Sequence, residues 1–424
     1  MPVARKSSVK LFVFLALFTL PLAAAVEVVK PEQVGLSSER LQRINQVIQR
    51  HVDAGNISGA ITVVARKGSV AHLQAQGLMD VESKTPMALD AVFRLASMTK
   101  PVVGVSILML VEEGKIRIND PVSRFIPAFK QLKVAVADLS GAAPIGAGTS
   151  PPGIPFTTVP ANREITIRDL LTHTSGLVSG AISAQEAAKA PRKSAETLAV
   201  YIPRLAVFPL EFQPGTRWAY SPGAGFDTLA RVVEIASGQS FDQFLRQRIF
   251  EPLGMKDTFF GPPEGRQSRV ASIYAKTGNG LEKRPTTDPR ALAGNVYFSG
   301  AGGLSGTTED YLRFAQMLLN GGLLNGKRLL GSRTVEWMTT VHTPENLPGR
   351  RPGQGFGLSV RVINDSGAGP TMLTEGSFGW GGAYGTLFWV DPKKQLIGLL
   401  MIQARPNTEI RTDFESAVMQ ALVD

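Results

Sequence analysis

The order of helix-like and strand-like segments constrains the fold of this chain more than any other feature of its sequence. A helical pattern over 37–54 and two strand patterns over 61–66 and 70–78 open the chain. A strand hairpin over 386–402 and a helical pattern over 412–422 close it, whereas most patterns in between are helical. This order predicts an α/β sheet domain that is built from both ends of the chain and carries an inserted helical domain.

Domain boundaries follow from the same pattern. We assign residues 26–90 and 296–424 to the sheet domain and residues 91–295 to the helical domain. Residues 128–161 and 178–209 are predicted to be long surface excursions of the helical domain. Further helical patterns occur over 97–113, 167–173, 225–237, 241–249 and 308–320.

Residues 1–25 have the parts of a secretory signal peptide. Arg5, Lys6 and Lys10 precede an apolar run, which is followed by a small-x-small end at Ala25. The apolar run is shorter than the roughly 20 residues that span a bilayer, so cleavage after Ala25 is favoured over retention as an anchor. We therefore expect an exported protein of a bacterial periplasm with no stable membrane anchor.

Composition removes several classes of function. The 424-residue chain has no cysteine, which excludes disulfide bonds, thiol nucleophiles, thiolate metal sites and a lipoprotein anchor. Its net charge of +10 comes from scattered basic residues, so nucleic-acid binding has little support. The four histidines lack ligand-like spacing, which disfavours a catalytic zinc site but leaves carboxylate-bound metals open. We interpret His173 as a residue that holds its loop by hydrogen bonds rather than as a base.

Ser97-Met-Thr-Lys100 begins a strongly apolar helical pattern. Because three residues are nearly one helical turn, both side chains are expected on one face. A serine hydroxyl is a poor nucleophile until a base takes its proton, and a buried lysine can act as that base. The spacing alone is weak evidence, because Ser7-Ser-Val-Lys10 repeats it within the signal peptide.

Two more segments carry residues suited to catalysis. Tyr220-Ser-Pro222 lies just before a helical pattern, and a tyrosine beside a serine and a lysine can pass a proton to a leaving group. The run Trp380-Gly381-Gly382-Ala383 precedes the closing hairpin, and its glycines let a substrate approach the backbone. A backbone N–H there can stabilise an oxyanion. Taken singly, these segments are better explained as a loop anchor and a tight corner.

Together and in this order, the motifs resemble the S-x-x-K, Y-x-N and K-T-G elements of the serine β-lactamase and penicillin-binding protein superfamily. Residues 166–177, 249–258 and 299–305 are similar to its class C-like branch, so the resemblance covers nearly all of the mature chain. It implies a β-lactamase/DD-peptidase-like fold of mixed α and β type. In that fold an antiparallel sheet is flanked by helices, an all-helical domain is inserted, and the site lies between them.

The chain departs from the superfamily at two motif positions. Pro222 replaces the asparagine of Y-x-N, and Trp380-Gly381-Gly382 stands where K-T-G is expected. The literal Lys276-Thr-Gly278 lies in a turn-rich stretch far before the closing hairpin, and we interpret it as unrelated to the site. W-G-G resembles the family VIII carboxylesterases. Its neutral aromatic wall suits an uncharged group and is expected to offer an anionic substrate no partner.

The resemblance implies a mechanism and leaves alternatives open. Ser97 attacks an ester carbonyl, Lys100 and Tyr220 transfer the proton, the N–H groups of Ser97 and Ala383 bind the oxyanion, and no metal or organic cofactor is needed. The substrate is expected to be a small ester or amide; the oligomeric state stays open. The alternatives are a class C-like β-lactamase, a D-amino-acid peptidase, a transacylase, and a non-catalytic envelope binding protein. The chain has no G-x-S-x-G motif, so an α/β-hydrolase elbow is excluded.

Overall fold

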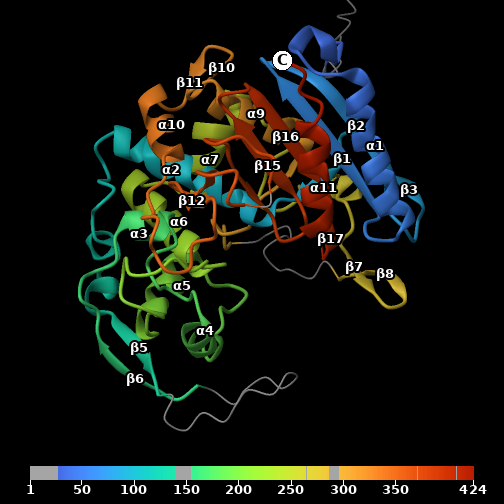
Figure 1. Ribbon diagram of the computed structural model, residues 1–424. Helices are drawn as coiled ribbons and strands as arrows, with labels where there is room; N and C mark the ends of the chain where they lie inside the picture. Colours follow the sequence, from blue (N-terminus) through green and yellow to red (C-terminus); the bar gives the residue numbers. More distant parts are fainter. Residues whose placement is uncertain (1–26, 139–153, 264, 286–295, 370, 407) are drawn as a thin grey trace, which may run out of the picture.

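The computed structural model describes residues 27–138, 154–263, 265–285, 296–369, 371–406 and 408–424. Within them, one eight-stranded antiparallel sheet has the order β12-β13-β14-β15-β16-β1-β2-β3 (Figure 1). Strands from the two ends of the chain meet where β1 pairs with β16, which confirms the predicted sheet. Its strands are β1 (Gly59–Arg66), β2 (Ser69–Asp80), β3 (Thr85–Pro86), β12 (Gln354–Phe356), β13 (Arg361–Ile363), β14 (Phe378–Gly381), β15 (Leu387–Asp391) and β16 (Leu396–Met401).

Helices cover both faces of this sheet, so its central strands are buried on two sides. Helices α1 (Ser38–Asp53) and α11 (Thr408–Met419) pack on one face, and α9 (Thr308–Leu319) packs on the other (Figure 1). Alternate side chains of a strand therefore enter two different cores. In β15, Trp389 lies 5.4 Å from Phe414 of α11, whereas Phe388 lies 5.0 Å from Tyr311 of α9, measured between ring centroids.

The closing helix begins earlier than predicted. Its α-helical hydrogen bonds run over Thr408–Met419 rather than over 412–422. The prediction is wrong by one turn at its start because Ile410 is buried and extends the apolar face that Phe414 and Val418 continue. The domain boundaries at 90/91 and 295/296 stay a prediction.

The inserted part of the chain is built around α2 (Thr99–Glu112), in which every residue from Thr99 to Leu110 is buried. A 3-10 turn over Ala96–Met98 precedes α2, so the predicted helix over 97–113 begins with tighter geometry. Helix α6 packs against α2. The other described helices are α3 (Ile167–Leu171), α4 (Ala181–Ala188), α5 (Leu198–Arg204), α6 (Ala224–Ser237), α7 (Phe241–Leu245), α8 (Glu251–Leu253) and α10 (Ser332–Thr339).

The chain also forms short strands outside the eight-stranded sheet. Strands β5 and β6 form a surface hairpin at the two ends of the predicted excursion over 128–161, whose residues 139–153 lie outside the described ones (Figure 1). The remaining pairs are β4 with β9, β7 with β8 and β17, and β10 with β11. Their bounds are β4 (Val92–Arg94), β5 (Lys133–Ala137), β6 (Phe156–Pro160), β7 (Tyr274–Thr277), β8 (Gly280–Lys283), β9 (Ser305–Thr307), β10 (Leu323–Leu324), β11 (Lys327–Arg328) and β17 (Ala404–Arg405).

The predicted signal peptide over 1–25 lies outside the described residues. In the described part of the chain, no helix is both long enough and apolar enough to cross a membrane.

Candidate active site

Ser97 lies in the 3-10 turn that leads into α2. The preceding residue, Ala96, has a φ of +47°, a left-handed conformation that residues with a side chain seldom adopt. The chain is held just before this turn, because the Leu95 N–H donates to the Leu304 carbonyl at 2.9 Å. A strained backbone of this kind persists only where its surroundings hold it, and such residues cluster at functional sites.

Three of the predicted site residues meet in space. The Oγ of Ser97 lies 2.6 Å from the hydroxyl oxygen of Tyr220, and Lys100 Nζ donates to the same Oγ at 3.2 Å. Lys100 Nζ also lies 5.0 Å from the centroid of the Tyr220 ring. The hydroxyl, the amine and the phenol thus share one hydrogen-bonded cluster, although Tyr220 is far from the other two in sequence. The contacts bring the three residues together, and their catalytic roles stay a prediction.

The amine of Lys100 is held by more than the serine. The side chain is fully buried, and Nζ donates to the carbonyl of Pro222 at 3.0 Å and to that of Ala301 at 2.7 Å. With Ser97 Oγ, these carbonyls give Nζ three oxygen partners, which is the number that an ammonium group can satisfy. Pro222 therefore contributes its backbone at the position where Y-x-N has a side-chain amide.

A buried carboxylate, Asp227 of α6, holds the segment that carries the Ala301 carbonyl. It accepts hydrogen bonds from the Tyr297 hydroxyl at 2.8 Å, from Ser299 Oγ at 2.7 Å and from the Ala301 N–H at 2.9 Å. Burial and the Asp227 charge raise the pKa of Tyr297 well above its usual range, so the phenol stays a donor. Sequence reasoning missed Asp227. The available signal was an acid in the first turn of an apolar helix, which needs partners once it is buried.

The W-G-G-A run ends β14 and enters a tight loop against the nucleophile turn. The Gly382 N–H donates to the Thr386 carbonyl at 2.7 Å, and Thr386 Oγ1 donates to the Leu95 carbonyl at 3.2 Å. A Cβ on Gly382 would lie 2.4 Å from that Leu95 oxygen, so glycine is required for this approach. Ala383 and Ser97 line the same cavity.

Two arginines hold the carbonyl groups of this loop. Arg405 Nε donates to the Ala383 carbonyl at 2.9 Å. Arg411 of α11 donates to the carbonyls of Gly382 and Thr386, the second at 3.1 Å. Burial, followed by the nearby Arg361 charge, lowers the pKa of Arg411 to about 10. The two arginines therefore fix the backbone of the loop that shares a cavity with Ser97.

His173 supports the Tyr220 segment, as expected from the sequence. Its Nδ1 accepts from the Ser221 N–H at 3.2 Å, its carbonyl accepts from the Ala219 N–H at 3.0 Å, and its ring lies 4.7 Å from the Tyr220 ring. Burial, and then the charge of Lys100, lowers the pKa of His173 well below its usual range. The imidazole is therefore neutral at physiological pH, and the tyrosine loop is bonded on both sides of Tyr220.

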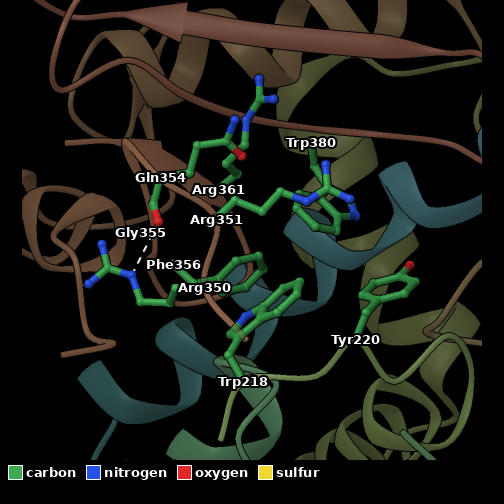
Figure 2. Close-up of a pocket in the computed structure, with 9 residues that line it drawn as sticks. All are labelled: Trp218, Tyr220, Arg350, Arg351, Gln354, Gly355, Phe356, Arg361 and Trp380. Atoms are coloured by element: carbon green, nitrogen blue, oxygen red, sulfur yellow. Dashed lines mark hydrogen bonds between the residues drawn. The ribbon is translucent and has the colours of Figure 1, made fainter. Parts of the chain in front are cut away.

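Two cavities meet at Tyr220. The first, of about 430 Å³, is lined by Ser97, residues 301–305 and the loop at Ala383. The second, of about 310 Å³, is bounded by aromatic side chains and lies beyond Tyr220 (Figure 2). Its aromatic wall consists of Trp218, Tyr220, Phe356 and Trp380.

The expectation that this aromatic wall offers an anion no partner is wrong. Arg350, Arg351 and Arg361 line the second cavity together with the aromatic rings (Figure 2). The cations come from β13 and from the segment before β12, and the sheet places β13 beside β14, with Arg361 opposite Gly379. Sequence reasoning missed them because it examined the W-G-G strand alone. We call this second cavity the arginine cavity.

The literal Lys276-Thr-Gly278 is separate from the site, in agreement with the interpretation from sequence. It lies in the β7–β8 hairpin, and Lys276 lines another cavity with His51 and Pro406. None of the described residues that line that cavity also lines either cavity at Tyr220.

The comparison with known proteins decides the family. The Beta-lactamase family matches residues 44–421. The chain belongs to the β-lactamase family. The predicted membership in the serine β-lactamase and penicillin-binding protein superfamily is thereby confirmed, and this β-lactamase-family protein is a serine hydrolase.

The proteins similar to it include an esterase, a putative carboxypeptidase and a hydrolase with acyltransferase activity. Esterase EstB of Burkholderia gladioli is 31% identical over 382 residues, which is 85% of this chain and 89% of EstB. A putative D-alanyl-D-alanine carboxypeptidase of Salmonella typhimurium is 27% identical over 90% of this chain and 86% of its own length. The solved structure of EstCE1, a hydrolase with promiscuous acyltransferase activity, is similar with a TM-score of 0.74 and 26% identity over 90% of this chain and 99% of EstCE1.

Proposed function

We propose that this β-lactamase-family protein hydrolyses carboxylic esters of small molecules through an acyl-enzyme on Ser97. The observation that carries the proposal is the contact of Ser97 Oγ with both the Tyr220 hydroxyl, at 2.6 Å, and Lys100 Nζ, at 3.2 Å. A serine with an acid–base partner within hydrogen-bonding distance meets the main requirement for nucleophilic catalysis.

In the first half of the reaction, Ser97 Oγ forms a bond to the ester carbonyl carbon as its proton moves to the Lys100–Tyr220 pair. The pair can accept this proton only when it starts with one proton fewer than an ammonium and a phenol hold together. The three oxygen partners of Nζ favour the remaining positive charge on Lys100, so the Tyr220 oxygen takes up the proton, and the lysine charge stabilises that oxygen before it does so. The N–H groups of Ser97 and Ala383 stabilise the carbonyl oxygen as it becomes negative. The carbon–oxygen bond to the alcohol then breaks, and the alcohol leaves with the proton from Tyr220.

In the second half, water adds to the acyl carbon, and its proton passes through the same pair to Ser97 Oγ. The acid leaves and the enzyme is restored. An alcohol in place of water would give acyl transfer, and EstCE1 is a hydrolase with promiscuous activity of this kind.

An ester is favoured over a β-lactam by the residues at the two altered motif positions. Trp380-Gly381-Gly382 supplies neither the cation nor the hydroxyl of K-T-G, and Pro222 supplies no side-chain amide. The relationship to esterase EstB supports the same choice. The carboxypeptidase-like relatives keep a D-amino-acid peptidase as the rival. A class C-like β-lactamase is the other rival. Rates on p-nitrophenyl butyrate, nitrocefin and a D-Ala-D-Ala peptide separate the three: a nitrocefin rate that rivals the ester rate would favour the β-lactamase, and a rate of D-alanine release that does so would favour the peptidase.

The role of Ser97 is tested with Ser97→Ala. We expect loss of p-nitrophenyl butyrate turnover and of covalent labelling by a fluorophosphonate, with a thermal midpoint close to that of the parent. Ser237→Ala at the end of α6 serves as the matched control and should keep both activities. Full labelling of the Ser97→Ala protein would remove Ser97 from the mechanism.

We also propose export to the periplasm with removal of residues 1–25, on the basis of the charged, apolar and small-residue segments at the N-terminus. The intact mass of the protein from a periplasmic fraction tests this. A mass that corresponds to a start at Val26 is expected, and a full-length mass in the cytoplasmic fraction would contradict it.

A further inference from the structure

The arginine cavity has a strongly unbalanced charge. Three guanidinium groups line it, and none of the described residues that line it is acidic. The cavity is bounded on its other sides by aromatic rings, which form a wall of low polarity and thereby strengthen electrostatic interactions next to it. A space of about 310 Å³ with this lining accommodates a ring and a short chain that ends in a negative charge.

The three arginines differ in how they are engaged. Arg350 donates to the carbonyls of Gln354 at 3.2 Å and Thr343 at 3.0 Å, and to a side-chain amide, so its guanidinium is anchored within the protein. Arg361 faces Glu415 at 3.6 Å. Arg351 is exposed, and its side chain has no hydrogen-bond or ion-pair partner among residues 27–424 as far as they are described. Figure 2 shows the Arg351 side chain extending along the cavity toward Trp380.

The surrounding charges also favour an anion. Behind Arg361 lies Arg411, and the Arg361 charge contributes, after burial, to the lowered pKa of Arg411. Glu415 pairs with Arg361 and is the acid that offsets these like charges. A bound carboxylate or phosphate would relieve the repulsion, and a guanidinium fork can donate two parallel hydrogen bonds to either group.

The position of Tyr220 indicates which half of a substrate would enter. Tyr220 lines both cavities and lies 2.6 Å from Ser97 Oγ. The oxygen that leaves must be close to the phenol that protonates it. The alcohol half of the ester therefore extends past Tyr220 between Trp218 and Trp380, and the acyl half stays in the first cavity.

We propose that the arginine cavity binds the alcohol half of esters in which that alcohol carries a carboxylate or phosphate-like group, and that Arg351 pairs with this anion. The inference rests on the proposed ester hydrolysis at Ser97. It assigns substrate recognition to residues 350–361, outside the three sequence motifs.

The test compares leaving groups that differ only in charge at a distance from the reacting bond. The probes are butyrate esters of 3-(4-hydroxyphenyl)propionate, of its primary amide and of the corresponding phosphonate. The two-carbon spacer keeps the acidity of the leaving phenol nearly constant. We expect kcat/KM for the carboxylate ester, the phosphonate ester or both to exceed that for the amide by roughly tenfold, the size of one charge-assisted interaction. The better of the two anions identifies the preferred group, and the preference should shrink as salt is raised.

Arg351→Gln should reduce the anion-to-amide ratio to near one, and Arg351→Glu should lower it below one and favour a trimethylammonium analogue. Arg333→Gln removes the same charge from an exposed position on α10 and should keep the parent ratio. All variants are compared by thermal midpoint. Because the readout is a ratio of two substrates on one protein sample, a loss of folded protein does not alter it.

Three results would overturn the inference. The first is equal kcat/KM of the parent on all three esters, and the second is an Arg351→Gln variant that keeps the preference. The third is a kcat/KM for 4-nitrophenyl hemiglutarate, an ester whose charge lies in the acyl half, that falls when Arg351 is replaced. Failure of the proposed ester hydrolysis can be told apart from failure of this inference. In the first case none of the esters would be hydrolysed, and none would acylate Ser97.

Discussion

Asp227→Asn is the most informative substitution outside the reacting residues. The carboxylate accepts from Tyr297, Ser299 and the Ala301 N–H, and the Ala301 carbonyl in turn accepts from Lys100 Nζ at 2.7 Å. Asparagine has nearly the same shape but carries one acceptor oxygen in place of two and no charge. The substitution therefore perturbs the position of Lys100 without touching Lys100 or Ser97.

The expected magnitude follows from the bonds that are lost. Asparagine offers one acceptor oxygen to Ser299 and Ala301, whose bonds become neutral and weaker, and it loses the charge-assisted bond from Tyr297, so the segment that carries the Ala301 carbonyl is held less firmly. A buried hydrogen bond to a charged group contributes about 1.5–3 kcal/mol, so the free energy of unfolding should fall by about 2 kcal/mol. A displacement of Lys100 by about 1 Å lowers the rate of a positioned reaction by roughly 100-fold, and this is the expected loss in kcat/KM.

The assay combines p-nitrophenyl butyrate hydrolysis across pH with urea unfolding. Tyr297→Phe removes one donor and leaves the carboxylate, so it should keep most of the activity while losing stability. Asp120→Asn is a matched control, because Asp120 accepts the Arg117 N–H at 2.8 Å and lines neither cavity at Tyr220. It should lower stability with kcat/KM near the parent value.

One result would refute the reasoning. If Asp227→Asn loses about 2 kcal/mol of stability yet keeps kcat/KM within roughly twofold and an unchanged pH profile, the Asp227–Ala301 link does not position Lys100. A loss of activity equal to that of Asp120→Asn at equal loss of stability would point to the same conclusion.

Two further predictions concern the loop at Ala383 and the stability of the fold. Arg411→Lys keeps the charge but loses the guanidinium, whose Nη2 donates to the Gly382 and Thr386 carbonyls and whose Nε donates to the Gly385 carbonyl. We expect kcat on p-nitrophenyl butyrate to fall roughly tenfold, and an unchanged kcat would show that the loop holds its shape without this arginine. Burial raises the pKa of Asp310 to about 6 from 3.8. Its stabilising contribution is therefore complete below pH 3.8 and is lost as pH rises through 6, by roughly 3 kcal/mol in total. In Asp310→Asn, the free energy of unfolding in urea should no longer show this loss between pH 4 and pH 7. If it falls equally with pH in the parent and the variant, Asp310 is not the group responsible.

Much of the fold could be predicted because its signals are local. The sheet follows from period-two strands and tight turns at both ends of the chain, and α2 follows from one long apolar run. The β5–β6 hairpin was not predicted because four of the five residues of β6 are exposed, so no alternation of apolar and polar residues marks it. The start of α11 was placed too late because Ile410 shows its role only once the opposing sheet is known.

In the site, too, the residues that lie in local motifs could be predicted, whereas those that act through partners distant in sequence could not. Ser97, Lys100 and Tyr220 could be proposed because each lies in a short motif, and the motifs in this order, together with longer segments, resemble one superfamily. Asp227 and Arg411 act through bonds to backbone groups far away in sequence, and no spacing encodes such a bond. The guanidinium groups that line the arginine cavity become visible only when the strand order places β13 beside β14.

The strand order also explains why losing the K-T-G cation need not mean losing anion recognition. In a K-T-G protein the cation lies on the strand that carries the oxyanion backbone, close to the reacting carbonyl. In this protein the corresponding strand is β14, which carries Trp380. The nearest guanidinium on the sheet belongs to Arg361 of the neighbouring strand β13, where it lies opposite Gly379 of β14. An elongated ester can place its anion near Arg361 while its carbonyl stays at Ser97, whereas a compact anion next to the scissile bond would face Arg94 and Arg405, which line the Ser97 cavity. We therefore expect discrimination against β-lactams to rest on the missing K-T-G hydroxyl and Y-x-N amide rather than on an absence of cations. Nitrocefin should remain a poor substrate of the parent protein even at low salt, where attraction to the arginines is strongest.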